Sequence, residues 1–239
     1  MLNQIEKRLK EINGGLVLDV ATGTGEFIDF IKEFASYDKI IAIDKMEKMK
    51  DLFNQRFLNE KKVEFKVMDA EYPDFANNTF DTICISNSLH HFKNIDFTLK
   101  QLSKILKPGG LIIINEMQSN DLTPSQKSHN MIHRFFAKLD VKKGMFHNPT
   151  LTSNKIIKIA SNLNFSNVEI FDYAFTIPEE HRDSQTIGLI NMLHKQDELL
   201  KNDTEYNDLH NEIKQIIEYL NKYSYSPAKS VFIVAQKSN

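Results

Sequence analysis

The sequence predicts a doubly wound α/β fold, in which helices pack on both faces of a largely parallel sheet. Three observations predict it. Short apolar runs alternate with helix-like segments through the first 116 residues, a pattern typical of βαβ units. The first three runs each end at or near an acidic residue. The first run also leads through a glycine-rich turn into an amphipathic segment. These observations place strands at 16–20, 39–44, 63–68, 80–85 and 111–116.

Composition limits the class of protein. The chain has 239 residues, of which 41% are hydrophobic and 26% charged, with a formal net charge of −2. This balance is typical of a soluble globular protein and lacks the overall basic field of a nucleic-acid binder. No run of about 18 apolar residues occurs, and the N-terminal segment lacks the apolar centre of a signal peptide. We therefore expect a cytoplasmic protein. The single cysteine, Cys84, lies in an apolar run, so we expect a buried, reduced thiol.

A small-residue turn at 21–25 joins the first strand to a helix that extends to about residue 34. At such a turn, glycines let the backbone approach a ligand, and the helix N-terminus offers unpaired N–H groups. An ordinary strand–helix turn with glycines for geometry alone is the alternative. The turn therefore suggests a small-molecule cofactor site without establishing one.

Acidic residues at the next two strand ends strengthen that hypothesis. Asp44 ends the second strand, 19 residues after Gly25, where an acid accepts hydrogen bonds from ribose hydroxyls in nucleoside-binding folds. It could instead cap the next helix, expected at 46–59, because Asp is a favoured N-cap. Asp69 follows the third strand and could accept a hydrogen bond from an exocyclic amine of a base, while Ala70 leaves room for a flat ring.

The remaining elements follow from apolar spacing. A short helix is expected at 3–12, and a helix at 96–106 is stopped by Lys107-Pro108-Gly109-Gly110. We find no internal repeat and no clear domain boundary, so we expect a single domain over 1–239. Its cofactor core would be 14–116, and 117–150 and 176–229 would form a partly helical cover that shapes the acceptor pocket. The other expected elements are a helix at 152–162, a strand at 168–175, two helical stretches within 183–222 and a strand at 230–235.

In order and spacing, these motifs resemble class I S-adenosylmethionine-dependent methyltransferases, in particular the branch that contains quinone-biosynthesis and small-molecule methyltransferases. The resemblance covers residues 14–116. It implies a Rossmann-like seven-stranded sheet, mostly parallel with an antiparallel last strand, and a helical cover over the active edge. The motifs are Leu18-Asp19-Val20-Ala21-Thr22-Gly23-Thr24-Gly25, Ile43-Asp44, Met68-Asp69-Ala70, Phe80-Asp81 through His90-His91-Phe92, and Leu106-Lys107-Pro108-Gly109-Gly110.

The same resemblance implies a function and a cofactor site. The cofactor would be S-adenosylmethionine, converted to S-adenosylhomocysteine as its methyl group passes by in-line displacement to a small-molecule acceptor. By position, the amino-acid end of the cofactor would contact Asp19, Ala21, Gly23 and Gly25. The ribose would contact Asp44, with Lys45 and Met46 beside the sugar and base, the adenine would contact Asp69 and Ala70, and the methionine portion would lie near Asn87. One departure is that Ala21 replaces the first glycine of the commoner pattern.

A nicotinamide oxidoreductase is a second hypothesis, and the turn argues against it. The dinucleotide fingerprint needs a third small residue for helix packing, where this sequence has Ile28. Glu26 would also face pyrophosphate oxygens unfavourably, whereas S-adenosylmethionine carries no phosphate. A methyltransferase acting on RNA or another macromolecule, and a non-catalytic cofactor-binding protein, remain open.

Catalytic candidates follow the fourth and fifth strands. His90 and His91 could remove a proton from the acceptor or orient it, or the pair could be structural, the interpretation we favour at this point. Glu116 ends the fifth strand and could reach the acceptor. His129 and His133 have the spacing of two metal ligands but lack a clear third ligand, so we expect no metal site.

Overall fold

The computed structural model describes residues 3–163, 165–201 and 206–238. These residues form two compact units, each built from separate stretches of the chain. The first unit comprises residues 1–116, 154–173 and 231–239, and the second comprises 117–153 and 174–230. The second unit nearly coincides with the segments expected to form the cover. That the chain works as a single domain stays a prediction.

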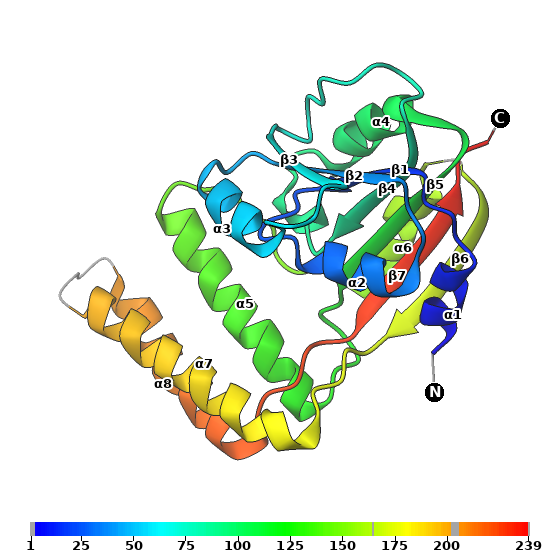
Figure 1. Ribbon diagram of the computed structural model, residues 1–239. Coiled ribbons are helices and arrows are strands. Elements are labelled where there is room, and N and C mark those ends of the chain that lie inside the picture. The colour runs from blue at the N-terminus through cyan, green and yellow to red at the C-terminus, as the bar shows by residue number, and fades with distance from the viewer. Residues whose placement is uncertain (1–2, 164, 202–205, 239) are drawn as a thin grey trace. The chain divides into compact units, whose positions relative to one another are not determined.

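A seven-stranded sheet forms the centre of the first unit (Figure 1). Its order is β3-β2-β1-β4-β5-β7-β6. The pairs from β3 across to β5 are parallel, whereas β7 runs antiparallel between β5 and β6. This confirms the predicted fold class. The strands are β1 (Leu16–Val20), β2 (Lys39–Asp44), β3 (Val63–Val67), β4 (Phe80–Ser86), β5 (Leu106–Met117), β6 (Ser166–Tyr173) and β7 (Ser230–Gln236).

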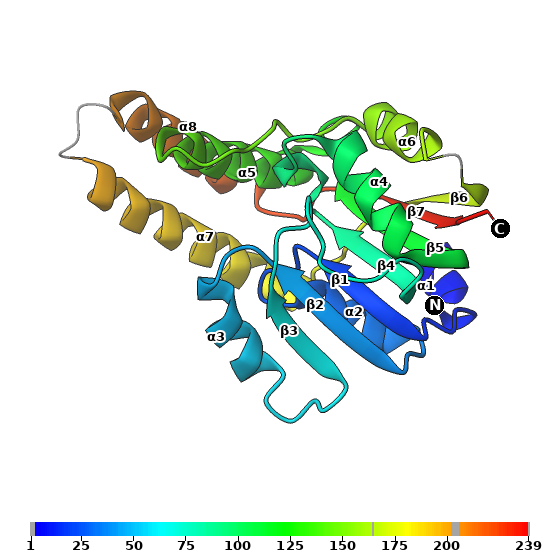
Figure 2. The same ribbon diagram turned by 90° about the horizontal axis from the view of Figure 1, so that it is seen from above.

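Helices cover both faces of this sheet (Figures 1 and 2). Helices α1 (Gln4–Lys10) and α2 (Glu26–Phe34) lie on one face, and α4 (Ile95–Ile105) and α6 (Ser153–Ser161) lie on the other. The apolar side of α2 is set by helical spacing and is buried. Its Phe27 packs on Phe232 of β7 with 6.1 Å between ring centroids. Helix α3 (Lys48–Arg56) packs beside β3.

Two elements differ most from the prediction. Helix α3 spans 48–56 instead of the expected 46–59, and before it the Met46 N–H donates to the Asp44 carboxylate at 2.8 Å. The segment 107–110 was expected only to stop a helix, but it belongs to β5. The strand bulges opposite β4 there, and Gly109 N–H donates to the Lys237 carbonyl at 3.0 Å. A bulge with a glycine in the left-handed region, here at φ 72°, allows pairing where the sequence indicated a break.

Three helices make up most of the second unit. They are α5 (Pro124–Lys142), α7 (Glu179–Leu200) and α8 (Asn207–Tyr223). Thr123 and Gln126 form a capping box at the start of α5, with proline in its first turn. The two helical stretches expected in 183–222 are therefore confirmed. No helix in the described parts of the chain is long and apolar enough to cross a membrane. The buried cluster that joins the three helices is Ile132, Phe135, Leu139, Leu193, Leu200, Leu209, Ile213, Ile216 and Leu220.

His129 on α5 is expected to make the second unit sensitive to acid. Burial lowers the pKa of His129 from 6.5 to about 4, and its Nδ1 accepts a hydrogen bond from the Ala228 N–H at 3.0 Å. The unfolded chain therefore binds more protons between pH 6.5 and 4, so stability falls as the pH falls through that range. We expect a loss of up to about 3 kcal/mol, at about 1.4 kcal/mol per pKa unit. Urea unfolding at pH 7 and pH 4.5 measures it, and His129→Gln should reduce the difference.

Candidate functional site

The turn after β1 bends through left-handed backbone conformations. Ala21 has φ 52°, Gly23 φ 55° and Gly25 φ 85°. Two backbone–backbone hydrogen bonds help to hold the turn: Thr22 N–H donates to the Ile43 carbonyl at 3.0 Å, and Gly25 N–H donates to the Thr22 carbonyl at 2.9 Å. Ala21, the departure from the commoner glycine, thus occupies a conformation that an L-residue adopts at a cost of about 1–2 kcal/mol.

The two glycines of the turn have different roles. A Cβ atom at Gly25 would overlap the ring of Phe57 and lie 3.0 Å from Cε2 of Phe53. At Gly23, a Cβ atom would meet no atom within 4 Å. Gly25, the residue before α2, is therefore required by packing behind the turn, whereas Gly23 faces open space.

That open space is a hollow of about 240 Å³ in the first unit. Four of the predicted cofactor residues line it: Asp19, Ala21, Gly23 and Asn87. The six other lining residues were not singled out from the sequence, although four of them lie inside the quoted motifs and two directly follow the glycine turn. They are Val20, Thr22, Thr24, Glu26, Phe27 and Ser86. The other six predicted cofactor residues do not line this hollow: Gly25, Asp44, Lys45, Met46, Asp69 and Ala70.

Asp19 places a buried carboxylate at this hollow. The residue is 2% exposed, and its Oδ2 atom has no hydrogen-bond partner among the described residues. Burial, and to a smaller extent the negative charge of Asp44, raise the pKa of Asp19 from 3.8 to about 7, although a side-chain interaction with Thr22 lowers it. A buried carboxylate oxygen without a partner costs free energy. The site therefore favours a ligand that brings a positive charge or hydrogen-bond donors to Asp19.

Asp44 connects the end of β2 to the glycine turn. It is 8% exposed, and its Oδ2 accepts a hydrogen bond from the Gly23 N–H at 2.9 Å. Lys45 beside it is exposed and Met46 is half-buried. A ligand bound to Asp44 at the end of β2 would therefore contact a side chain that also binds the backbone of the glycine turn.

The end of β3 lies next to the end of β2. Met68 N–H donates to the Asp44 carbonyl at 3.0 Å. Asp69 is exposed, and its Oδ1 accepts from the Glu71 N–H at 2.9 Å, whereas Ala70 is buried. The three acids predicted from the motifs thus end three neighbouring strands of one sheet edge.

The turn after β4 forms the other wall of the hollow. Asn87 is exposed and has φ 46°, and its N–H donates to the Asn115 carbonyl of β5 at 2.7 Å. Asn115 Nδ2 also donates to Ser86 Oγ at 2.8 Å. The position of Asn87 is therefore set by the neighbouring strand.

His90 and His91 occupy the short 3-10 helix η1 (Leu89–His91) that follows. Their rings lie 4.3 Å apart between centroids. His90 is 1% exposed and His91 is half-buried. Glu116 is fully buried, and its carboxylate contacts the turn that carries these histidines. That His90, His91 and Glu116 act in catalysis stays a prediction.

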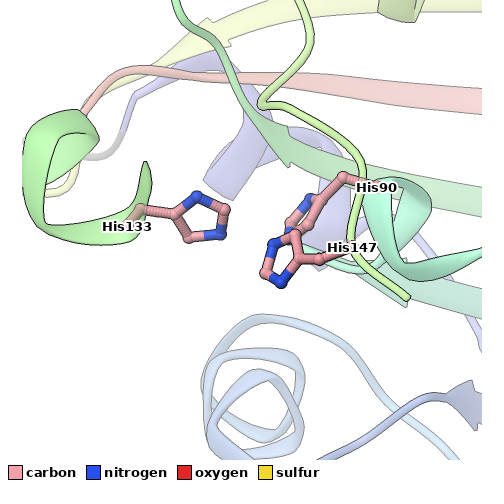
Figure 3. A group of neighbouring side chains, drawn as sticks. All are labelled: His90, His133 and His147. Carbon is pink, nitrogen blue, oxygen red and sulfur yellow. The ribbon is translucent and has the colours of Figure 1, made fainter. Parts of the chain in front are cut away.

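The remaining histidines belong to the second unit. Figure 3 labels His133 and His147 of that unit, and His90 of the first. His133 and His147 pack edge to face with 5.1 Å between ring centroids, and His133 Nδ1 lies 3.1 Å from Thr150 Oγ1. The Nδ1 atom of His129 instead accepts the Ala228 N–H. His129 Nδ1 therefore accepts a backbone hydrogen bond and does not bind a metal ion together with His133 in this structure.

Comparison with known proteins agrees with the geometry. Residues 18–114 match the family described as methyltransferase domain. A demethylmenaquinone methyltransferase from Bacteroides fragilis is 29% identical over 122 residues, covering 50% of each chain. The ubiquinone/menaquinone biosynthesis C-methyltransferase UbiE from Hydrogenovibrio crunogenus is 33% identical over 107 residues, covering 43% of this chain and 42% of the relative. The match thus spans about half the length of these curated relatives.

A solved structure shows the same fold over almost the whole chain. Phosphoethanolamine N-methyltransferase 2 from Haemonchus contortus, solved in complex with S-adenosyl-L-methionine, has a TM-score of 0.57 and 20% sequence identity. The similarity covers 98% of this chain and 51% of that protein. At this identity the likeness establishes the fold alone.

Proposed function

We propose, from the match of residues 18–114 to the methyltransferase domain family, that this chain transfers a methyl group from S-adenosylmethionine to a small-molecule acceptor. The observation that carries the proposal is the buried, unpartnered carboxylate oxygen of Asp19 at the wall of the glycine-turn hollow. S-adenosylmethionine brings an ammonium and a sulfonium cation, so it supplies the positive charge that this carboxylate lacks.

The residues present fit this cofactor. Gly23 leaves space at the turn, and Asp19 offers an acceptor for the amino group. Asp44 has a carboxylate at the end of β2 to receive ribose hydroxyls, and Asp69 with Ala70 ends the next strand, where the adenine would lie. A cofactor without phosphate groups also suits the negative charges of Asp19, Glu26 and Asp44, because these charges would repel a pyrophosphate.

The protein's own tasks in the reaction are binding, alignment and water exclusion. When bound, the cofactor supplies a methyl group already activated on a positively charged sulfur. Asp19 would hold the amino-acid end of the cofactor and Asp44 its ribose, and Asn87 would form the wall beside the methionine portion. His90 or His91 would take a proton where the acceptor must lose one.

A small-molecule acceptor and a cytoplasmic location are part of the proposal. The curated relatives are named as quinone-biosynthesis methyltransferases, which supports a small acceptor. The net charge of −2 argues against RNA or DNA, because such partners require a basic surface.

Titration calorimetry with S-adenosylmethionine, S-adenosylhomocysteine and NAD⁺ tests the cofactor. We expect binding of the first two and none of the third. A methyl-release assay with candidate acceptors then separates an enzyme from a non-catalytic binder. Binding of NAD⁺ without binding of S-adenosylhomocysteine would contradict the proposal.

Asp44→Asn is expected to weaken S-adenosylhomocysteine binding at least tenfold, about 1.4 kcal/mol. The amide oxygen can keep one backbone hydrogen bond, but the charged acceptor for ribose hydroxyls is lost, and hydrogen bonds to charged groups are the stronger ones. Calorimetry measures the change. Asp51→Asn on the exposed side of α3 is the matched control, and it should bind like the parent.

A further inference from the structure

Glu116 is a fully buried carboxylate that the proposed cofactor site does not use. It lies near the end of β5 and is 0% exposed. Its Oε2 accepts hydrogen bonds from two consecutive backbone groups, the Ser88 N–H at 3.0 Å and the Leu89 N–H at 3.1 Å. Its Oε1 lies 2.5 Å from His90 Nδ1. One side chain thus binds three successive residues of the turn after β4.

These contacts define the hydrogen-bonding role of the carboxylate. Carboxylate oxygens accept hydrogen bonds, and two backbone N–H groups already donate to Oε2. With His90 Nδ1 as the donor in the third contact, Nε2 is the ring nitrogen that carries no hydrogen in the neutral ring.

The same contacts shape the hollow. The turn that Glu116 binds begins at Asn87, which lines the hollow, and Ser88 Oγ donates to the Ser86 carbonyl at 2.6 Å. Asn87 is in the left-handed region at φ 46°, a conformation that costs free energy and that surrounding contacts must hold. Glu116 supplies two of those contacts at the next two residues.

We propose that Glu116 is a positioning residue. It holds the turn beside the cofactor hollow, and it fixes the tautomer of His90 so that Nε2 accepts the proton that the acceptor loses during methyl transfer. This inference rests on the proposed function for its last clause only. The tautomer and the turn are properties of the ligand-free protein.

The decisive variant is Glu116→Gln, which keeps the size of the side chain. Its amide oxygen can accept the two backbone N–H groups, and its NH₂ group then faces His90 Nδ1 as a donor. The hydrogen on His90 must therefore move from Nδ1 to Nε2. Glu116→Ala is unsuitable because it leaves buried N–H groups without a partner and is expected to unfold the turn.

Nitrogen-15 NMR of the histidine rings measures the tautomer directly. The His90 signals are assigned by their loss in His90→Gln. We expect protonated Nδ1 in the parent protein and bare Nδ1 in Glu116→Gln at pH 8. Glu71→Gln is the matched control, because Glu71 also accepts a backbone hydrogen bond, from Lys93 N–H at 3.0 Å. It should leave the His90 signals unchanged. Bare Nδ1 in the parent, or an unchanged tautomer in Glu116→Gln, overturns the proposal.

Turnover of the acceptor found in the methyl-release assay tests whether His90 accepts a proton during methyl transfer. We expect Glu116→Gln to lower kcat at least tenfold while the KM for S-adenosylmethionine changes less than threefold. In the His90→Gln background the added effect of Glu116→Gln should vanish, because the two residues act through one another. An equal loss in both backgrounds contradicts a role through His90. Failure of the parent to bind S-adenosylhomocysteine would instead refute the proposed function and leave the tautomer result standing.

Discussion

Asp19→Asn is expected to make the ligand-free protein more stable at pH 8 while it weakens binding of S-adenosylmethionine more than tenfold. In the parent, burial raises the pKa of Asp19 from 3.8 to about 7. The folded state therefore holds a proton that the unfolded chain has released, and stability falls as the pH rises from about 4 to 7. Above pH 7 the full cost is present.

The size of the effect follows from that shift. Three pKa units correspond to about 4 kcal/mol. The asparagine adds a buried amide whose hydrogen bonds are incompletely made, at a cost of about 1–3 kcal/mol. We expect a net gain of about 2 kcal/mol at pH 8 and a net loss of about 2 kcal/mol at pH 4, where only the cost of the amide remains.

Urea unfolding of both proteins at pH 4, 6 and 8 measures the gain, and calorimetry with S-adenosylmethionine measures the loss of binding. His129 lowers the stability of the parent as the pH falls, whereas Asp19 lowers it as the pH rises. The difference in stability between parent and variant at each pH therefore isolates the effect of Asp19. Equal stability of the two proteins at pH 8 would contradict an uncompensated charge at Asp19.

Gly25→Ala is expected to destabilise the first unit by about 3 kcal/mol. The methyl group would overlap the Phe57 ring and crowd Phe53, and overpacking of a core costs about 1–3 kcal/mol. The left-handed conformation at φ 85° adds about 1–2 kcal/mol. Thermal and urea unfolding measure the loss.

Gly23→Ala is the matched control for that variant. Its backbone is also left-handed, at φ 55°, but its new methyl group meets no atom within 4 Å. We expect about 1 kcal/mol of destabilisation together with a clear loss of S-adenosylhomocysteine binding, since the methyl group enters the hollow. If both variants lost the same stability, the packing role assigned to Gly25 would be wrong.

Local patterns were sufficient to predict most of the fold. Apolar runs and helical spacing identify every strand of the sheet, and the turn at 21–25 identifies where the ligand edge begins. The larger failure is at a position where long-range pairing decides. Gly109 looks like a helix terminator from its neighbours, yet it pairs beside Lys237, more than a hundred residues away. The other failure is local: Met46 looks like the start of a helix, but α3 begins at Lys48.

The site was predictable as a set of residue types but not as a set of contacts. Asp19, Asp44 and Asp69 follow from the ends of strands, because parallel strands bring their carboxyl ends to one edge. The contact between Glu116 and His90 joins positions 26 residues apart, and no local pattern indicates it. The different roles of Gly23 and Gly25 depend on Phe53 and Phe57 behind the turn, which the motif itself does not contain.

The place of β7 in the sheet has a consequence for how the protein is made. β7 lies between β5 and β6, yet residues 174–230 of the second unit are translated between β6 and most of β7. β6 therefore has no neighbour in the sheet until the ribosome has passed residue 236. During translation, all segments of the second unit are therefore synthesised before the last segment of the first unit. Until then the sheet lacks β7, and β6 has no strand to pair with.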